Sequence, residues 1–519
     1  MNVLLINPPY QTITSNIGVG HQVPLGLLMV GGALTDAGHT VRLLDAEYER
    51  STIPHIAREA MLSGCDVVMT GHAGSTPAHP ICVAMLRAIK NACAAVSTIY
   101  GGVYPTYHAE RILSDEAAID YIVRGEGEAT AVELLAALSA SDAARRLPSV
   151  SGISYRRDGV AVRNIDRAPI KDLDEFRIGW ELITNWDRYQ CFGLGRAAII
   201  QFSRGCPHRC TYCGQHGFWV SWRHRDPIRL ADEIEWLYKT HDIRFITLAD
   251  ENPTTRQDVW REFLEELTAR KLPVCLFSTI RATDIVRDAE LLPLYHRAGM
   301  RYILMGIEST NPQVIQQIRK GSSTRHDYLA CQLLRKNNIF SILGHIVGLE
   351  DDSWRGFATA LKQLNLYDGD YLNAMYVTPH SWTQFAREVG ERGVVQLDQT
   401  KWDYRHQVLE QKHLRPWELF LAVKWLELRF HLRPRKLKVL LRASNAFGRR
   451  QMYWTLLHTA MVWLAEIAEF CWSTSFARRP NSLRETITIH PRDASAKDNA
   501  APVWPPAQLL HYRPGENEK

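Results

Sequence analysis

Two successive series of short apolar strands, in which a helical pattern follows each strand, constrain the fold of this chain more than any other feature. The first series contains five predicted strands, at residues 3–6, 40–45, 66–70, 97–100 and 120–123. Strands that alternate with helices are typical of a parallel sheet covered by helices on both faces. The sequence therefore predicts an α/β protein that begins with a doubly wound parallel sheet, with ligands at the carboxyl ends of its strands.

The second series contains six predicted strands, at residues 197–202, 244–248, 274–280, 302–307, 340–347 and 371–377. Six strand–helix units in a row predict a partial (β/α)6 barrel, in which functional residues lie at the carboxyl ends of the strands. The strand pattern stops near residue 400, and most of the sequence that follows is helical, basic and rich in tryptophan.

The pattern divides the 519 residues into five predicted regions. These are a sheet domain (1–147), a linker with a short hairpin (148–191), the barrel (192–400), a basic helical region (401–480) and a flexible tail (481–519). Residues 401–480 contain 15 basic and 6 acidic residues, a net charge of +9, whereas the rest of the chain carries −4. The overall charge of +5 is no signature of nucleic-acid binding, and we expect no nucleic-acid partner.

No segment reaches the roughly 18–20 uncharged apolar residues that a membrane span requires. The longest apolar stretch, 452–472, is interrupted by His458, Glu466 and Glu469. The N-terminus has no basic region, and its apolar run is too short for a signal peptide. We therefore expect a cytoplasmic protein whose ten cysteines are thiols or metal ligands rather than disulfides.

Three of these cysteines, Cys206, Cys210 and Cys213, lie within eight residues of the loop after the first predicted barrel strand. A zinc site usually takes four ligands, commonly from two separated cysteine pairs, and the chain has no second pair. A closed [4Fe–4S] cluster takes four cysteines, so three thiolates suit a cluster with one open iron. The spacing therefore predicts an iron–sulfur site at the carboxyl end of a barrel strand.

This C-x3-C-x2-C loop resembles the signature of the radical S-adenosylmethionine (SAM) superfamily. The resemblance implies that the three cysteines hold a [4Fe–4S] cluster and that SAM binds its open iron. It further implies that reduction cleaves SAM to methionine and a 5′-deoxyadenosyl radical, which takes a hydrogen atom from the substrate. Tyr212 matches the aromatic residue that the family usually has before the last cysteine, which implies a position near the cluster or the adenine.

The same resemblance implies SAM contacts at the ends of the following barrel strands. The acidic residues would bind the amino group or the ribose and carboxylate region, the polar residues would hydrogen-bond to SAM, and the glycines would let the backbone approach it. The implied contacts are Asp250, Glu251, Ser278, Arg281, Gly306, Glu308 and Gly348. The alternatives are helix capping for Asp250 and Glu251, and a salt bridge at the barrel end for Glu308.

The first sheet resembles the cobalamin-binding domain of the B12-dependent branch of this superfamily. The resemblance rests on the loops at residues 101–106 and 124–128, and it implies cobalamin contacts at Gly101, Gly102, Thr106, Gly125 and Glu126. The D-x-H-x-x-G motif, whose histidine ligates cobalt, is absent, and the loop after the first strand holds only His21. Cobalamin would then bind without that imidazole, since a packing role is favoured for His72 and His79.

Two further stretches, 376–383 and 402–409, resemble the anaerobic oxidative cyclases that act on magnesium-protoporphyrin IX 13-monomethyl ester. The resemblance implies closure of the isocyclic ring to divinylprotochlorophyllide in bacteriochlorophyll synthesis. Oxygen would come from water, and an electron donor such as a ferredoxin or flavodoxin would reduce the cluster. It assigns no catalytic residue. The alternative is a B12-dependent radical SAM methyltransferase that acts on a tetrapyrrole or another unactivated carbon.

The C-terminal half offers groups that suit a flat, anionic macrocycle. Candidate stacking and ligating side chains are Trp382, Trp402, Tyr404, Trp417, Trp425, His380, His406 and His413. The alternative for each aromatic residue is an ordinary core position. The basic segment 424–450 has two interpretations: a dock for substrate carboxylates or for anionic lipid at the inner membrane, or a solvated basic face.

Overall fold

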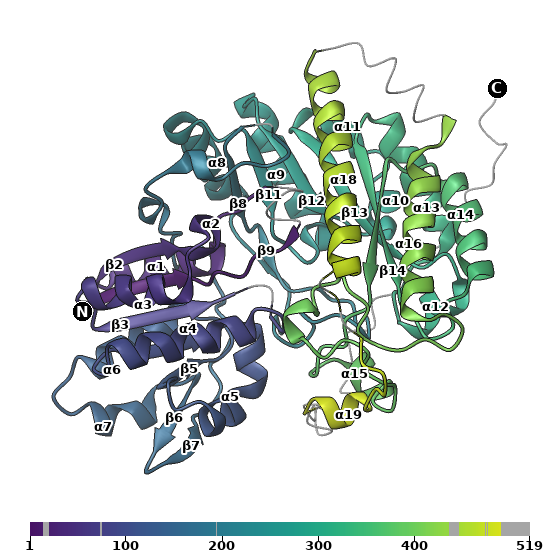
Figure 1. Cartoon of the computed structure of the whole chain (residues 1–519). Coiled ribbons are helices and arrows are strands. Elements are labelled where there is room, and N and C mark those ends of the chain that lie inside the picture. Colours follow the sequence, from purple (N-terminus) through teal and green to yellow (C-terminus); the bar gives the residue numbers. More distant parts are fainter. Residues whose placement is uncertain are drawn as a thin grey trace.

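The computed structural model describes residues 1–13, 20–72, 75–193, 195–434, 446–472, 474 and 476–488. It forms two lobes, each built on one large sheet (Figure 1). The first sheet has the strand order β2-β1-β3-β4-β5-β6-β7. Its strands are β1 (Asn2–Asn7), β2 (Thr40–Asp45), β3 (Val67–Gly71), β4 (Ser97–Gly101), β5 (Tyr121–Val123), β6 (Ile153–Arg157) and β7 (Val160–Arg163).

Strands β1–β5 are parallel, as predicted, and alternate side chains of β1 enter two separate cores. Leu4 and Ile6 face one cluster, whereas Val3 and Leu5 face the other, because successive side chains of a strand point to opposite faces. The helices that cover these faces are α1 (Leu25–Asp36), α2 (Ala46–Glu49), α3 (Ile53–Leu62), α4 (His79–Ala92), α5 (Val103–Asp115), α6 (Glu128–Leu138) and α7 (Ala143–Arg146). The prediction of a doubly wound sheet is confirmed.

The hairpin predicted within the linker is present, and it belongs to the first sheet. Strand β6 pairs antiparallel with β5, and β7 pairs antiparallel with β6. The sheet-forming part of the first lobe therefore extends to Arg163, beyond the predicted boundary at residue 147. A sequence pattern reveals a hairpin but not the edge strand to which it adds.

The second sheet consists of six parallel strands that neighbour one another in chain order, which confirms the partial barrel. These strands are β8 (Ala197–Ile200), β11 (Phe245–Leu248), β12 (Cys275–Thr279), β13 (Met300–Glu308), β14 (Phe340–Val347) and β15 (Tyr371–Tyr376). The connecting helices are α8 (Pro227–His241), α9 (Gln257–Arg270), α10 (Ala282–Arg287), α11 (Leu292–Arg297), α12 (Pro312–Gln317), α13 (Thr324–Lys336) and α14 (Trp354–Tyr367). Caps begin several of them: Asp226 accepts two backbone N–H groups of α8, and Ser323 accepts one of α13.

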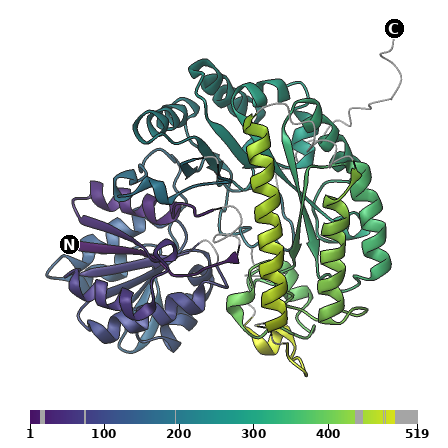
Figure 2. The same ribbon diagram turned by 45° about the horizontal axis from the view of Figure 1, so that its top comes forward.

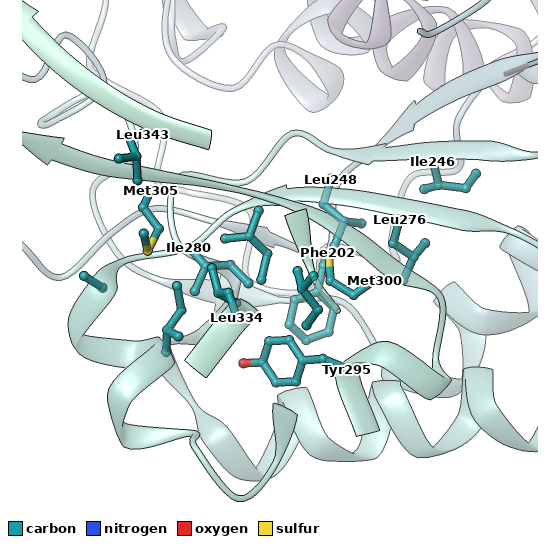
Figure 3. Packing of buried hydrophobic residues seen from close by; sticks show 14 of the residues in the cluster. Phe202, Ile246, Leu248, Leu276, Ile280, Tyr295, Met300, Met305, Leu334 and Leu343 are labelled. Carbon is teal, nitrogen blue, oxygen red and sulfur yellow. The ribbon is translucent and has the colours of Figure 1, made fainter. Parts of the chain in front are cut away.

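Between the strands and the helices lies one large apolar core (Figure 3). Phe202, Leu276 and Met305 all lie in it with essentially no exposed surface. The one polar tip in the close-up, the hydroxyl of Tyr295, is satisfied because it donates to Asp288 at 2.7 Å. This packed core leaves the carboxyl ends of the strands as the place for chemistry.

The C-terminal region is helical, as predicted, with α15 (Gln384–Glu388), α16 (Pro416–His431), α18 (Ala446–Trp472) and α19 (Leu483–Thr486). Helix α18 runs along the second lobe beside α16 (Figure 2). Trp454 of α18 contacts the ring of Phe192 just before β8, and Thr459 donates to the hydroxyl of Tyr371 on β15. The helix therefore links the two edge strands of the open barrel.

Residues 481–488, predicted as the start of a flexible tail, are ordered. Leu483 is fully buried, and its N–H donates to the carbonyl of Arg392 at 2.8 Å. The rest of the predicted tail lies outside the described residues. Within the described part of the chain, no helix is long and apolar enough to cross a membrane.

Candidate functional site

The three clustered cysteines lie in the loop between two short strands, β9 (Ser203–Arg204) and β10 (Arg223–His224), just after the carboxyl end of β8. Gly205 starts this loop with φ +93°, and a Cβ there would lie 2.4 Å from the carbonyl oxygen of Ser221, so only glycine fits. The pairing of β9 with β10 closes the base of the loop.

Four backbone or indole contacts hold the cysteine loop in place. The N–H of Thr211 donates to Ile318, its carbonyl accepts from Phe385, and the carbonyl of Gly214 accepts from the indole of Trp382 at 2.7 Å. A turn closed by the N–H of Cys213 and the carbonyl of Cys210 completes the set. The loop is therefore anchored to segments after β13 and β15 and is rigid where the thiols project.

The three thiols are close enough to influence one another. Burial raises the pKa of Cys206 to about 11, with smaller contributions in the same direction from Cys213 and Cys210. Within the described residues, no three His, Cys, Asp or Glu side chains converge on one metal ion. A [4Fe–4S] cluster needs a different arrangement, since each of its cysteine thiolates binds its own iron. Three neighbouring thiols on a rigid loop fit such a cluster.

Asp250 and Glu251, at the end of β11, differ in their environments. Asp250 accepts hydrogen bonds from the N–H of Phe202 at 3.1 Å and from the hydroxyl of Ser203 at 2.5 Å, so it holds the chain that leads into the cysteine loop. Neither its expected SAM contact nor the helix-capping alternative describes this role. Glu251 has a buried carboxylate oxygen without a hydrogen-bond partner. Burial raises the pKa of each carboxyl group to about 7.

Glu308, at the end of β13, forms the salt bridge that was the alternative to a SAM contact. Its carboxylate lies 2.7 Å from Lys320 and accepts from the hydroxyl of Tyr212. The backbone of Glu308 is left-handed, with φ +59°, next to a bulge in β13. A Cβ on Gly306 would lie 2.1 Å from that carboxylate, so Gly306 makes room for Glu308.

Ser278, near the end of β12, and Arg281, just after it, face the same region. The Ser278 hydroxyl and the Arg281 Nε are buried without hydrogen-bond partners, while another nitrogen of Arg281 donates to the carbonyl of Lys320. Buried polar atoms in native proteins are almost always paired, so these atoms indicate a ligand or an ordered water. Together with Glu251 they fit a small molecule with several polar groups, such as SAM.

Two residues that the sequence did not single out belong to the same group. His345 on β14 has a buried Nδ1 without a partner, and both carboxylate oxygens of Asp327 on α13 are buried without partners. Burial lowers the pKa of His345 to about 4 and raises that of Asp327 to about 8. The sequence signal that could have identified His345 was a histidine within a largely apolar strand. Gly348, with φ +84°, lies in a turn whose N–H groups donate to Asp352; its predicted contact with adenine stays a prediction.

The carboxyl ends of the first sheet form a surface of backbone and small side chains. A Cβ on Gly71 would lie 2.7 Å from the carbonyl of Gly101, and Gly102 has φ +106°. Thr106 donates to the carbonyl of Gly102 at 2.7 Å and accepts from the N–H of Gly125 at 2.9 Å. Thr106 thus ties the loops after β4 and β5 together. The order β2-β1-β3 places a topological switch point beside them, where doubly wound sheets bind large cofactors. These observations fit cobalamin.

The histidines of the first lobe have packing partners, in line with the prediction. His21 lies 2.9 Å from Asp45, His72 lies 3.7 Å from Glu47, and His79 stacks on Tyr104 with ring centroids 4.1 Å apart.

Glu126 joins the two lobes. Its carboxylate accepts from Arg204 on β9 at 3.1 Å and from Arg223 on β10 at 2.6 Å, and all three side chains are buried or nearly so. Glu128 forms a second ion pair with Arg204. The predicted cobalamin contact at Glu126 is therefore occupied by an interlobe ion pair, which needs partners that lie far away in the sequence.

The aromatic candidates divide into core and exposed positions. Trp382 and Trp402 are buried, with their indoles bonded to Gly214 and Gln396, so the core interpretation is right for both. Tyr404 and Trp417 are exposed. His406 lies between Asp403 and Glu469 at 2.9 and 3.3 Å, and their carboxylates raise its pKa to about 9 against the effect of burial.

The basic segment is only partly described. Lys424 pairs with Glu427 and Glu466 in the interior, and Arg433 pairs with Asp368. These cations do not form a free basic surface. Arg435, Lys436, Lys438 and Arg442 lie outside the described residues, as do the side chains of Arg449 and Arg450.

Comparisons with known proteins agree with this geometry. The B12 binding domain model matches residues 17–135, and the radical SAM superfamily model matches residues 200–364. The chain is 45% identical to the anaerobic magnesium-protoporphyrin IX monomethyl ester cyclase of Synechocystis over 485 residues, 93% of this chain and 96% of the relative. It is 32% identical to the cyclase of the same name from Rubrivivax gelatinosus over 76% of this chain and 70% of that relative.

Among solved structures, the cobalamin-dependent SAM radical enzyme OxsB is similar with a TM-score of 0.65, and 90% of this chain and 72% of that one are covered. At 18% identity this likeness concerns the fold alone. Relatives named as methyltransferases or methylases share 25% identity or less over comparable lengths, as does the hopanoid C-3 methylase of Methylococcus capsulatus.

Proposed function

The chain belongs to the family of anaerobic magnesium-protoporphyrin IX monomethyl ester cyclases, and from that premise we propose that it closes the isocyclic ring of that substrate to give divinylprotochlorophyllide, with oxygen from water. It is a radical SAM enzyme with a B12-binding domain, whose cofactors are a [4Fe–4S] cluster, SAM and cobalamin. The observation that carries the proposal is the meeting of a three-cysteine loop, buried unpartnered polar atoms and a glycine-lined sheet end between two lobes.

In this proposal the residues bind, orient and exclude water. Cys206, Cys210 and Cys213 hold the cluster, and Glu251 and Ser278 hydrogen-bond to SAM. When bound, these cofactors supply the 5′-deoxyadenosyl radical that removes hydrogen from the substrate side chain. The rigid loop and the apolar core beneath it shield the radical from bulk solvent until it has taken the hydrogen atom, after which water supplies the keto oxygen.

Anaerobic turnover with magnesium-protoporphyrin IX monomethyl ester, SAM and a reductant tests the proposal. We expect a product with the mass of divinylprotochlorophyllide, 18O from labelled water in its keto group, and 5′-deoxyadenosine as the fate of SAM. Formation of S-adenosylhomocysteine together with a methylated tetrapyrrole would instead support the methyltransferase alternative. The proposal includes a ferredoxin or flavodoxin as electron donor, which the same assay identifies by replacing the chemical reductant with each protein.

We further propose that the enzyme docks on an anionic membrane surface through α16 and α18. Among the described side chains of α18 the large exposed ones are apolar, while its acidic residues Glu466 and Glu469 are paired on the inner side. The exposed apolar side chains described on the two helices, together with Leu432 directly after α16, are Trp417, Leu421, Leu428, Leu457, Met461, Leu464, Ile467 and Trp472. A helix with polar groups inside and apolar groups outside suits a lipid interface.

The net charge of residues 429–450 indicates which lipid headgroups this surface would bind. The sequence from 429 to 450, between the two apolar stretches, contains eight basic residues and no acidic residue, which favours anionic headgroups. Co-sedimentation with phosphatidylglycerol vesicles tests this. We expect the variant Leu457→Glu/Leu464→Glu to lose binding, whereas Trp236→Glu, an exposed aromatic residue on α8, keeps it. Equal binding of all three proteins, or concentration-dependent dimers without vesicle binding, would overturn membrane docking.

A further inference from the structure

His380, in the second lobe, is bonded through one ring nitrogen to the first lobe and through the other to Tyr404 of its own lobe. Its Nδ1 lies 2.9 Å from the hydroxyl of Thr76, which precedes α4 in the first lobe. Its Nε2 lies 2.7 Å from the hydroxyl of Tyr404. The imidazole is 2% exposed and stacks on Trp382 with ring centroids 4.9 Å apart. It is therefore held rigidly between two hydroxyl groups.

Tyr404 as a whole residue is 44% exposed, unlike His380, whereas burial raises the pKa of its hydroxyl group. Its neighbours come from the ligand-binding ends of both sheets: ionisation of Cys213 raises the pKa of Tyr404, and ionisation of Tyr404 raises the pKa of Tyr10, just after β1, so the three groups lie near one another. The Tyr404 backbone has φ +67°, a conformation that is costly for a side chain of this size. An exposed ring in a strained conformation, with a hydroxyl fixed by a buried imidazole, is typical of a functional position.

The hydrogen bond between His380 and Tyr404 leaves the Tyr404 hydroxyl able to donate a hydrogen bond to another group. Burial lowers the pKa of His380 to about 4, so the ring is neutral near pH 7. A neutral imidazole with Nε2–H donates to the Tyr404 oxygen and leaves the Tyr404 proton free for another acceptor. The Thr76 hydroxyl then donates to Nδ1, so that both imidazole nitrogens are paired.

We propose that Tyr404 is a substrate-contacting residue whose hydroxyl donates a hydrogen bond to the ester carbonyl of the macrocycle's side chain, and that His380, supported by Thr76, is its positioning residue. The inference rests on the proposed function, which supplies an ester beside the carbon to be oxidised. It also unites the two stretches that set this chain apart by sequence, since His380 lies in 376–383 and Tyr404 in 402–409. The backbone N–H of Tyr376 donates to the carbonyl of Tyr404 at 2.8 Å, which fixes their spacing.

The variant Tyr404→Phe tests the contact, because it keeps the ring and removes only the hydroxyl. We expect its cluster and corrinoid content to equal those of the wild type. The cyclised product per SAM cleaved should fall about 10- to 100-fold, the range for one hydrogen bond to a reacting group. The control Tyr328→Phe, an exposed tyrosine on α13, should leave this ratio unchanged.

A second readout needs no turnover. The fluorescence of magnesium-protoporphyrin IX monomethyl ester, titrated with the anaerobically purified protein without SAM, reports binding alone. We expect weaker binding for Tyr404→Phe and for His380→Ala, and recovery in His380→Gln, whose amide can replace Nε2–H. Thr76→Val should give a smaller loss than His380→Ala, because it acts through the imidazole.

The outcomes separate the two proposals. A wild-type protein that forms no cyclised product overturns the proposed function, and the binding titration then decides the role of Tyr404 alone. An active wild type with an equally active and equally tight-binding Tyr404→Phe overturns the inference. Loss of corrinoid from Tyr404→Phe also overturns it, because the hydroxyl would then serve the cofactor.

Discussion

The parallel strands of the two sheets end in opposite ways, although both sets direct their carboxyl ends toward ligands. The end of the first sheet is lined by glycine backbone, and Thr106 joins two of its loops. The end of the second sheet holds buried ionisable and hydroxyl groups, several of them without partners, as in Glu251, Ser278 and Asp327. The end of the first sheet offers a backbone surface for close approach, whereas the end of the second sheet offers side-chain groups that can hydrogen-bond to a ligand.

This contrast follows from the size of what each end accepts. A large, rigid corrinoid needs close approach of backbone, which glycine permits because it has no Cβ. A small zwitterion such as SAM needs a few placed donors and acceptors, whose burial is tolerable only when the ligand satisfies them. The division predicts that changes at one end affect one cofactor and leave the other in place.

The largest expected effect comes from the cysteine loop. Replacing Cys206, Cys210 or Cys213 by alanine should abolish the cluster and all SAM cleavage, because each thiolate holds one iron. Iron and sulfide analysis with electron paramagnetic resonance of the reduced protein checks this, while the corrinoid content should stay near that of the wild type. Cys331→Ala, a buried cysteine on α13, is the control. SAM cleavage in any one loop variant would contradict the assignment.

The next effect should separate two adjacent carboxylates. Glu251→Gln should raise the dissociation constant of SAM about 10- to 100-fold with the cluster intact, since it loses one charged hydrogen bond. Asp250→Asn should instead lose cluster and thermal stability, because Asp250 holds the backbone before the cysteine loop. Equilibrium binding of SAM and iron content distinguish the two. Loss of the cluster in Glu251→Gln together with weaker SAM binding in Asp250→Asn would assign the two roles the other way round.

A smaller effect should appear at the first sheet. Thr106→Val removes the hydroxyl that joins two loops, so we expect a corrinoid content about tenfold lower at limiting cobalamin, with an unchanged cluster. Thr35→Val removes a similar hydroxyl bond in α1, from Thr35 to the carbonyl of Gly31 at 2.8 Å, and should keep cobalamin. Loss of the cluster in Thr106→Val would contradict the expectation that a change at the first sheet affects cobalamin alone.

The smallest expected effect is a pH dependence of stability that arises from His406, on the barrel side of the molecule. His406 has a pKa of about 9 rather than 6.5, so its stabilising contribution, about 3 kcal/mol at most, is complete below pH 6.5 and is lost as the pH rises through 9. His406→Gln should lower the melting temperature at pH 6 and match the wild type above pH 9. Thermal unfolding at both pH values measures this; a constant difference would show that the histidine stays uncharged.

The positions of the strands along the chain, the two series of parallel strands and the cysteine site could be predicted because each depends on local patterns. Apolar runs of four to eight residues mark strands, and three thiols within one loop need no distant partner. The assignment of polar residues was less complete. Ser278 and Glu251 have buried atoms without partners, and their contacts with SAM stay predictions, whereas His345 and Asp327 were overlooked because a single polar residue in a strand or an amphipathic helix carries no spacing signal.

What the sequence by itself determined is the alternation that builds two sheets, the iron–sulfur loop and the family. The tertiary structure alone decided which charged groups are free. Glu126 finds Arg204 across 78 residues of chain, and Lys424 finds Glu466, so neither is free for a ligand. It also decided that His380 and Tyr404 meet. The physical reason is that periodicity is a property of neighbouring residues, whereas a hydrogen bond between lobes depends on how two finished domains pack.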